Sequence, residues 1–119
     1  MKTIMIVDDS TFMRRMLREI VTRNGYDVVA EAQNGKIAVE QYKLNKPDIV
    51  TMDVTMTEMN GLEALQKILE FDPDANVVMV SSMSQEIIVR DAIVVGAKGF
   101  IVKPFEEKQI ITAFAKLIK

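Results

Sequence analysis

The side chains that could carry chemistry in this sequence are carboxylates, hydroxyls and one lysine, and each lies at or just after the end of a short apolar run. They are Asp8, Asp9, Asp53, Ser81, Ser82 and Lys103. The sequence contains no histidine and no cysteine, which excludes a Ser/His/Asp triad, a thiol nucleophile and a zinc site with His or Cys ligands. Carboxylate chemistry is therefore the leading class, and oxygen ligands alone favour a hard divalent cation such as Mg²⁺.

We expect these side chains to meet in one crevice, because an open parallel sheet binds ligands at the carboxyl ends of its strands, where the winding reverses. Asp8, Asp9 and Asp53 would then crowd together, and like charges this close raise one another's pKa unless a cation compensates them. With the cation and Lys103 neutralising a phosphoryl group, Asp53 could attack phosphorus in line while Ser81 donates to an equatorial oxygen. Each residue alone has a plainer explanation as a helix cap, a turn residue or a surface lysine, but caps and turns do not require the whole set.

Short apolar runs that alternate with stretches of helical period predict the elements that position these residues. The expected strands are Thr3 to Val7, Asp27 to Ala32, Asp48 to Met52, Asn76 to Ser81 and Gly99 to Val102. Ser10 and Asn60 precede two of the helical stretches and are expected to begin those helices. Five strands and five helices predict an α/β fold: a flavodoxin-like, doubly wound (βα)5 parallel sheet with the order 2-1-3-4-5.

Composition limits the remaining function classes. The 119 residues, 49% of them hydrophobic, suit one domain over 1–119. A formal net charge of -2 argues against a nucleic-acid partner. No stretch approaches a signal-peptide core or a membrane span, and the absence of cysteine fits a reducing compartment. We therefore expect a cytoplasmic protein with no membrane partner.

At these same residues the sequence resembles the receiver domains of response regulators. The resemblance extends from Ile4 to the last helical stretch. Its motifs are Ile-Val-Asp8-Asp9-Ser, Pro47-Asp-Ile-Val-Thr-Met-Asp53, Met59-Asn-Gly61 and Gly96-Ala-Lys-Gly-Phe-Ile-Val-Lys103-Pro104-Phe105. The resemblance implies a phosphorylation-dependent switch of a two-component system, which assists its own phosphotransfer but is not a classical enzyme.

The resemblance also implies roles for the acidic residues. Asp53 would take the phosphoryl group from a phosphohistidine on a sensor histidine kinase, and the absence of histidine here agrees with a donor on another protein. The pair Asp8 and Asp9 would hold Mg²⁺ together with Asp53, helped by the backbone carbonyl of Thr55. Lys103 would contact the bound phosphoryl group.

A second set of residues would transmit the signal. In the family, the residues matching Ser81 and Phe100 rearrange together on phosphorylation and change the face made by the fourth helix, fifth strand and fifth helix. Ser82, next to Ser81, stands where a small apolar residue is common and is a second candidate for the same role. Ile87 and Val94 share one side of an unusually apolar helical stretch, which we interpret either as a docking or dimer surface or as a broad core contact.

Within the family the sequence is most similar to stand-alone chemotaxis regulators of Gram-positive bacteria and Thermotoga-like lineages. The similarity lies in Val-Asp-Asp-Ser-Thr-Phe12-Met13-Arg14 and Val50-Thr-Met-Asp-Val-Thr-Met. It implies a CheA-like sensor histidine kinase, output to a flagellar motor switch protein or another protein, and a separate phosphatase. Because the sequence ends with its fifth helical stretch, we expect output through protein binding. A stand-alone receiver in another phosphorelay is the alternative.

Besides Ser82, four positions depart from the family pattern. Thr57 replaces a usual proline in the loop after Asp53. Phe100 lacks the hydroxyl of a tyrosine, so any switching there would be apolar packing. Thr55 and Met83 occupy positions that in relatives often orient the hydrolytic water. Because neither is an acid or an amide, we expect slow self-dephosphorylation.

Three other classes fit the sequence less well. A Mg²⁺-dependent phosphohydrolase of the haloacid dehalogenase type needs a second acid two residues after the nucleophile, where this sequence has Thr55. A flavin-binding module needs a hydroxyl- and glycine-rich phosphate loop after the first strand, and Asp8 and Asp9 would repel a flavin phosphate. A docking module without phosphorylation would be expected to lose an acid or the lysine, and neither is lost.

Overall fold

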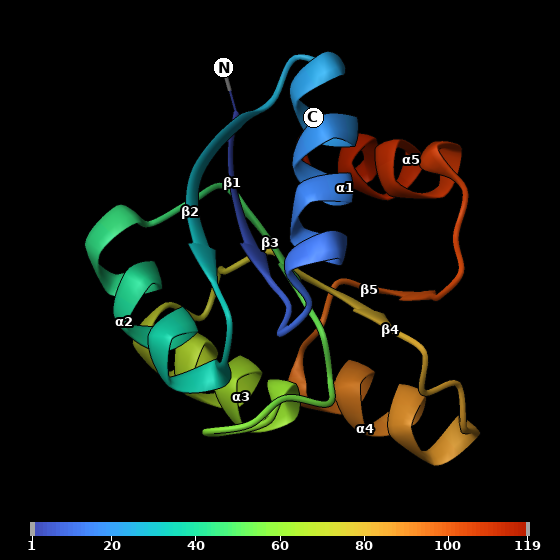
Figure 1. The fold of residues 1–119 in the computed structure, drawn as a ribbon. Helices are drawn as coiled ribbons and strands as arrows, with labels where there is room; N and C mark the ends of the chain where they lie inside the picture. Colours follow the sequence, from blue (N-terminus) through green and yellow to red (C-terminus); the bar gives the residue numbers. More distant parts are fainter. Residues whose placement is uncertain (1, 119) are drawn as a thin grey trace.

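The computed structural model describes residues 2–118, in which five parallel strands alternate with five helices (Figure 1). In chain order the elements are β1 Thr3–Val7, α1 Thr11–Arg23, β2 Asp27–Ala32, α2 Gly35–Asn45, β3 Ile49–Met52, α3 Gly61–Phe71, β4 Val77–Ser81, α4 Glu86–Val95, β5 Gly99–Val102 and α5 Glu107–Leu117. The sheet order is β2-β1-β3-β4-β5 and every neighbouring pair is parallel. The predicted flavodoxin-like fold is confirmed. Across residues 2–118, every helix is too short or too polar to span a bilayer.

Two of the predicted strands begin one residue too early. β3 starts at Ile49 rather than Asp48, and β4 starts at Val77 rather than Asn76. The carboxylate of Asp48 accepts hydrogen bonds from the amide and hydroxyl of Thr3, at 2.7 and 3.0 Å. Asn76 donates its side-chain amide to the carbonyl of Asp48 at 3.2 Å. These polar side chains tie the beginnings of neighbouring strands together, which the apolar pattern does not reveal.

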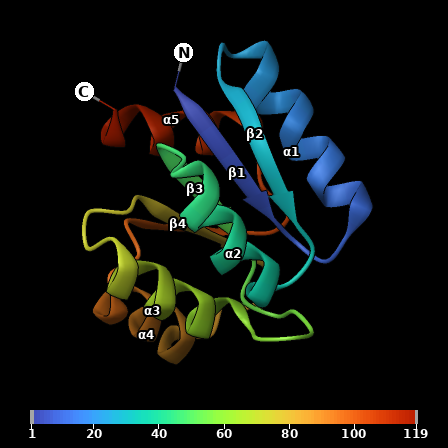
Figure 2. The same ribbon diagram turned by 90° about the vertical axis from the view of Figure 1, so that its left-hand side faces the viewer.

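Helices cover both faces of the sheet and create two apolar cores (Figures 1 and 2). Side chains alternate between the cores because successive residues of a strand point to opposite faces. Ile4 and Ile6 pack with α1 and α5, whereas Met5 and Val7 pack with α2, α3 and α4. Each such fully buried side chain stabilises the fold by about 1.5–3 kcal/mol. Helices thus cover both faces of the sheet, and polar side chains collect at the ends of its strands.

The polar residues before α1, α2 and α3 lie in loops that follow strands, and each caps its helix with its side chain. Ser10 and Asn60, as predicted, precede α1 and α3, and Asn34 precedes α2. Their side chains accept backbone N–H hydrogen bonds from Met13 at 3.2 Å, Glu63 at 3.0 Å and Ile37 at 2.8 Å, respectively. Each cap satisfies an N–H that the helix itself cannot and fixes where the preceding loop must end.

Candidate functional site

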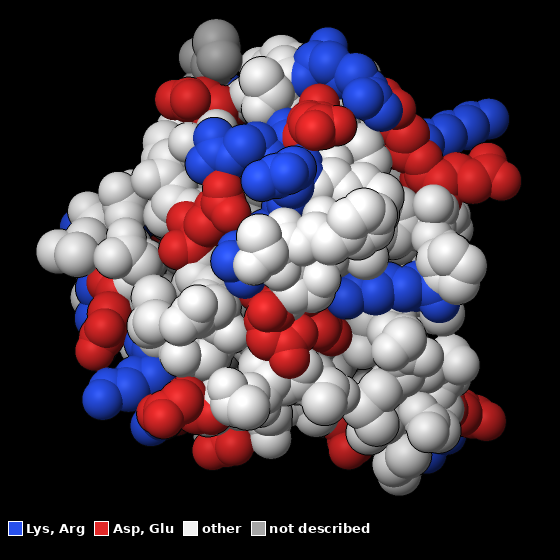
Figure 3. Space-filling model, viewed as in Figure 1, with Lys and Arg blue, Asp and Glu red and all other residues white. Residues whose placement is uncertain are grey.

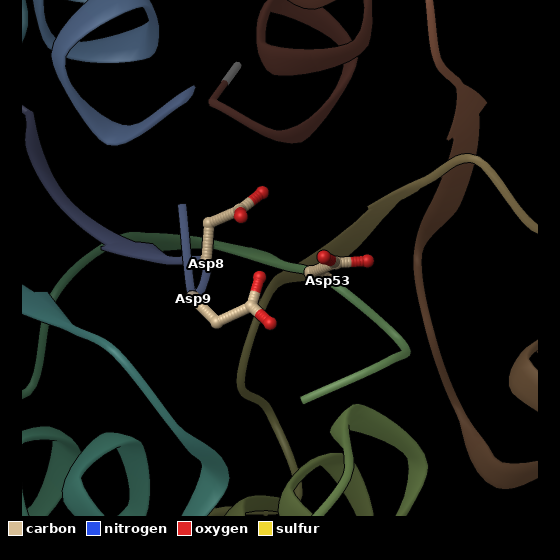
Figure 4. Close-up of side chains that lie close together, drawn as sticks. All are labelled: Asp8, Asp9 and Asp53. Atoms are coloured by element: carbon tan, nitrogen blue, oxygen red, sulfur yellow. The ribbon is translucent and has the colours of Figure 1, made fainter. Parts of the chain in front are cut away.

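Three carboxylates from two neighbouring strands meet at one edge of the sheet. Asp8 and Asp9 follow β1 and Asp53 follows β3, and one oxygen from each lies within 4.8 Å of the others. Figure 4 shows the three side chains gathered at the ends of these strands. Asp8 and Asp53 are buried, whereas Asp9 is exposed. The group is therefore partly desolvated and reachable from solvent on the side of Asp9.

Lys103, which follows β5, reaches two of these carboxylates. Its Nζ lies 2.7 Å from Oδ2 of Asp8 and 3.4 Å from Oδ2 of Asp53. The lysine side chain is only 15% exposed, so the charges interact more strongly than they would in water. The Lys103–Pro104 peptide bond is cis. The structure thus brings together the acids and the lysine that the sequence analysis grouped.

The electrostatics of this crevice favour a bound cation. Burial raises the pKa of Asp53 above its ordinary value, Lys103 opposes this rise, and the neighbouring carboxylate of Asp8 adds to it. Three carboxylates beside one ammonium leave an excess of negative charge, which a divalent cation would neutralise. The donors are all oxygen atoms, so the site fits a hard cation.

The two adjacent serines differ in their surroundings. Ser81, the last residue of β4, is buried, and its Oγ accepts a hydrogen bond from the amide of Met83 at 3.1 Å. Its hydroxyl also opposes the rise in the pKa of Asp53. Ser82 is exposed. Ser81 is therefore the serine whose hydroxyl interacts with the carboxylate of Asp53.

The other residues singled out from the sequence lie outside this group of charges. Thr55 donates its hydroxyl to the sulfur of Met83 at 2.8 Å. Phe100, in β5, is half-buried against the core that includes α2, α3 and α4. Ile87 and Val94, on α4, are 61% and 77% exposed. Helix α4 therefore presents an apolar surface to solvent at these two positions.

Two glycines, neither among the site residues predicted from the sequence, determine the path of the loop after Asp53. The amide of Gly61 donates to the carbonyl of Val54 at 2.8 Å, and the amide of Gly35 donates to the carbonyl of Met59 at 3.0 Å. A Cβ on Gly61 would lie 1.9 Å from the carbonyl oxygen of Asp53, and one on Gly35 would lie 2.3 Å from that of Met59. Only glycine permits such approaches. The Met59-Asn-Gly61 motif is the sequence signal for this arrangement.

Comparison with known proteins places the same residues in a family. The response regulator receiver domain family matches residues 4–115. The chain is 52% identical over 118 residues to the chemotaxis protein CheY of Thermotoga maritima, covering 99% of this chain and 98% of that protein. It is 51% identical over 115 residues to CheY of Bacillus subtilis, covering 97% and 96%.

Solved structures agree with the sequence matches. The crystal structure of a CheX–CheY–BeF3–Mg²⁺ complex from Borrelia burgdorferi includes a chain that matches with a TM-score of 0.96 and 38% identity, covering 99% of this chain and 90% of that chain. The response regulator domain of Thermotoga maritima CheB matches with a TM-score of 0.84 and 36% identity, covering 97% and 91%. Similarity therefore extends over the whole sheet and the crevice at its edge.

Proposed function

The chain belongs to the response regulator receiver domain family, and we propose that Asp53 is the residue on which it accepts a phosphoryl group. It is a chemotaxis response regulator, a phosphoaccepting signalling switch rather than a classical enzyme. We propose also that residues 1–119 form one receiver domain. The observation that carries the assignment of the acceptor is the meeting of three acids and a lysine at one edge of the sheet: Asp8, Asp9, Asp53 and Lys103.

Mg²⁺ is the cation that we propose for this crevice. Its ligands would be the carboxylates of Asp8, Asp9 and Asp53, with the backbone carbonyl of Thr55. When bound, it supplies positive charge that neutralises the phosphoryl oxygens. Support comes from the spacing of the carboxylate oxygens within 4.8 Å and from the presence of Mg²⁺ in the complex that contains the Borrelia burgdorferi relative.

The transfer that we propose is an in-line displacement at phosphorus. A carboxylate oxygen of Asp53 forms the new bond to phosphorus, and the bond from phosphorus to the donor's histidine nitrogen breaks. Lys103 would exchange its contact with Asp53 for one with a phosphoryl oxygen, and the 3.4 Å separation of its Nζ from Oδ2 of Asp53 supports this. The absence of histidine from this sequence agrees with a donor histidine on another protein.

Signal output would begin at Ser81. Its Oγ now accepts from the amide of Met83, and we propose that it turns to donate to a phosphoryl oxygen when Asp53 is modified. Phe100 would then repack, which would alter the face that α4, β5 and α5 form. The exposed side chains of Ile87 and Val94 would contribute apolar contacts to a partner on this face.

The partners that we propose follow from the relatives. The phosphoryl donor would be a CheA-like sensor histidine kinase, and the output would go to a flagellar motor switch protein or another protein. The relative from Borrelia burgdorferi occurs in a complex with CheX, and a protein of that kind, acting as a phosphatase, is our candidate for ending the signal. A cytoplasmic location and the absence of a nucleic-acid or membrane partner stay predictions.

A small phosphodonor tests the assignment of the acceptor. The full chain is incubated with acetyl phosphate, with and without Mg²⁺, and its intact mass is followed. We expect a gain of one phosphoryl group that depends on Mg²⁺, is abolished in Asp53→Asn, and is retained in Asp74→Asn. Asp74 is a matched control because it is an exposed acid before β4, away from the crevice.

Two other outcomes would reject this assignment. A phosphoryl adduct on the Asp53→Asn variant would place the acceptor elsewhere. Steady release of phosphate without an adduct would favour a phosphohydrolase.

A further inference from the structure

Arg14, near the start of α1, directs its side chain to the loop that carries Asp8 and Asp9. The side chain is only 16% exposed. Its Nη1 donates to the backbone carbonyl of Asp8 at 2.6 Å, its Nε to Oε1 of Glu31 at 3.2 Å, and its Nη2 to the hydroxyl of Thr11 at 3.3 Å. A planar guanidinium engaged at three nitrogen atoms is held in one orientation. Arg14 is therefore a fixed contact between α1, β2 and the loop after β1.

The carbonyl that Arg14 contacts belongs to the peptide unit between two proposed cation ligands. The amide of Asp8 donates to the carbonyl of Ala32 at 3.1 Å, and its Oδ1 accepts from the amide of Ser10 at 2.9 Å. Asp8 is thus held at its amide, its carbonyl and its carboxylate. Asp9 is exposed, so the direction of its carboxylate depends on the backbone that precedes it. The bond from Arg14 fixes the plane of that backbone.

Glu31 on β2 completes the arrangement and provides an internal control. Its Oε1 pairs with Arg14, and its Oε2 pairs with Nε of Arg18 at 2.6 Å. Arg18 is 48% exposed, and its contact is with Glu31 rather than with the loop. On the face of the molecule that Figure 1 presents, Figure 3 shows Lys and Arg side chains beside Asp and Glu side chains. The two arginines therefore share one carboxylate but differ in whether they contact Asp8.

We propose that Arg14 is a positioning residue for the divalent cation: through the carbonyl of Asp8 it orients the Asp8–Asp9 peptide so that both carboxylates face Asp53. The proposal rests on the cation site proposed above. Residues that orient metal ligands in this way change metal affinity by about 10- to 100-fold when they are replaced. The pair with Glu31 holds the guanidinium in place and offsets its charge, which by itself would repel a cation.

The direction in which the Mg²⁺ affinity changes distinguishes a positioning role of Arg14 from a purely electrostatic one. Removing a positive charge near a cation site tightens cation binding if charge alone matters. Arg14→Gln and Arg18→Gln would then both bind Mg²⁺ more tightly than the wild type. If Arg14 positions the loop, Arg14→Gln binds Mg²⁺ more weakly although it has lost a positive charge. A role in stability alone would change the unfolding midpoint and leave the Mg²⁺ affinity unchanged.

The experiment is a calorimetric titration of the full chain with MgCl2, together with urea unfolding of each variant. We expect Arg14→Gln to weaken Mg²⁺ binding by about tenfold or more, and Arg18→Gln to stay within about twofold of the wild type. Arg14→Lys keeps the charge but not the fork of donors, so we expect its affinity to fall between these two. If Arg14→Gln does not fold, the Mg²⁺ affinities of Arg14→Lys and Arg18→Lys are compared instead.

Each remaining result is decisive. Unchanged or tighter Mg²⁺ binding in Arg14→Gln, or in Arg14→Lys if only that variant folds, overturns the proposal while leaving the cation site intact. Equal weakening in the Arg18 variant overturns it as well, because the lower Mg²⁺ affinity would then come from the contact with Glu31 that both arginines make. It would not come from the contact of Arg14 with Asp8. A wild-type chain that does not bind Mg²⁺ rejects the cation site itself, and the role of Arg14 with it.

Discussion

Replacing Gly61 by alanine is the substitution whose effect the structure determines most directly. Gly61 is the first residue of α3, and the backbone of Asp53 occupies the space in which a side chain on Gly61 would lie. A Cβ would lie 1.9 Å from the carbonyl oxygen of Asp53, 2.8 Å from its carbonyl carbon and 2.9 Å from Cα of Val54. All three are backbone atoms, so no rotamer change relieves the contact. Either α3 or the acceptor loop must move.

The size of the effect follows from these distances. The closest contact is about 1.5 Å shorter than the 3.4 Å at which ordinary contact begins. Overpacking costs about 1–3 kcal/mol, and a 1.9 Å approach to a backbone atom belongs to the upper part of that range, about 2–3 kcal/mol. The better helix propensity of alanine offsets about 1 kcal/mol of it. We expect a net loss of about 1–2 kcal/mol, which lowers the melting temperature by roughly 4–8 °C. Because displacement of a reacting group by about 1 Å can cost 100-fold in rate, phosphorylation should slow by about tenfold or more.

Gly99→Ala is the matched control. A Cβ there would meet only side-chain carbons of Val78, at 3.7 and 4.0 Å, which is ordinary contact. We expect a melting temperature equal to that of the wild type or up to about 4 °C higher, since Gly-to-Ala changes without strain stabilise a protein by about 0.4–1 kcal/mol. The assays are thermal unfolding and the rate of phosphorylation by acetyl phosphate with Mg²⁺. A Gly61→Ala protein with wild-type stability and rate would refute the reasoning, as would equal damage from Gly99→Ala.

Three further predictions concern stability, pH and signal lifetime. The hydroxyl of Thr51 is buried without a hydrogen-bond partner within residues 2–118, so Thr51→Val should be as stable as the wild type or about 1 kcal/mol more stable; a clear loss in urea unfolding would contradict this. Hydrogen bonding to Arg23 is the main cause that lowers the pKa of Glu107 from 4.5 to about 2. A carboxyl group whose pKa is lower in the folded than in the unfolded state stabilises the protein at pH values above its unfolded-state pKa. This stabilisation is lost as the pH falls through the folded-state pKa. The stability advantage of the wild type over Glu107→Gln should therefore be constant above about pH 5.5 and fade as pH approaches 2; an advantage that grows on acidification would contradict it. Because Thr55 bonds to the sulfur of Met83 and neither residue is an acid or an amide, the phosphorylated chain should lose its phosphoryl group slowly without a phosphatase, and a half-life of seconds or less would count against this.

The fold was predictable because its strands are short apolar runs separated by polar loops. Residues such as Ile4, Met5 and Ile6 are buried on both faces of the sheet, which gives continuous apolar sequence rather than alternation. The two errors, at Asp48 and Asn76, occur where polar side chains bond to neighbouring strands. Such bonds join residues far apart in the chain, so no local pattern indicates them.

The candidate site was predictable in its members but not in its packing. Carboxyl ends of parallel strands share one edge, so acids after β1 and β3 had to be neighbours once the strand order was assumed. Which serine faces them was open, because Ser81 and Ser82 are adjacent and differ only in direction. In the structure the hydroxyl of Ser81 interacts with Asp53, whereas Ser82 is exposed, and a shared role for Ser82 stays a prediction. The roles of these residues stay predictions until the phosphorylation assay is done.

By itself, the sequence determined the chemistry that is available. The absence of histidine and cysteine excludes imidazole and thiol chemistry, and the positions of Asp8, Asp9 and Asp53 after apolar runs favour oxygen ligands and a carboxylate nucleophile. The family motifs are also local, since each consists of consecutive residues in one strand or loop and the segments next to it. These properties depend on residue type and on spacing along the chain, which the sequence states directly.

Only the tertiary structure decided the contacts between distant segments. Lys103 meets Asp8 across 95 positions of sequence, and Arg14 reaches the carbonyl of Asp8 and Glu31 at once. The loop before Gly61 turns through Glu58 and Met59, which adopt positive φ angles of 56° and 93° although neither is glycine. The reason is physical: side-chain direction and loop path depend on how helices and strands pack, and packing sums contributions from the whole chain.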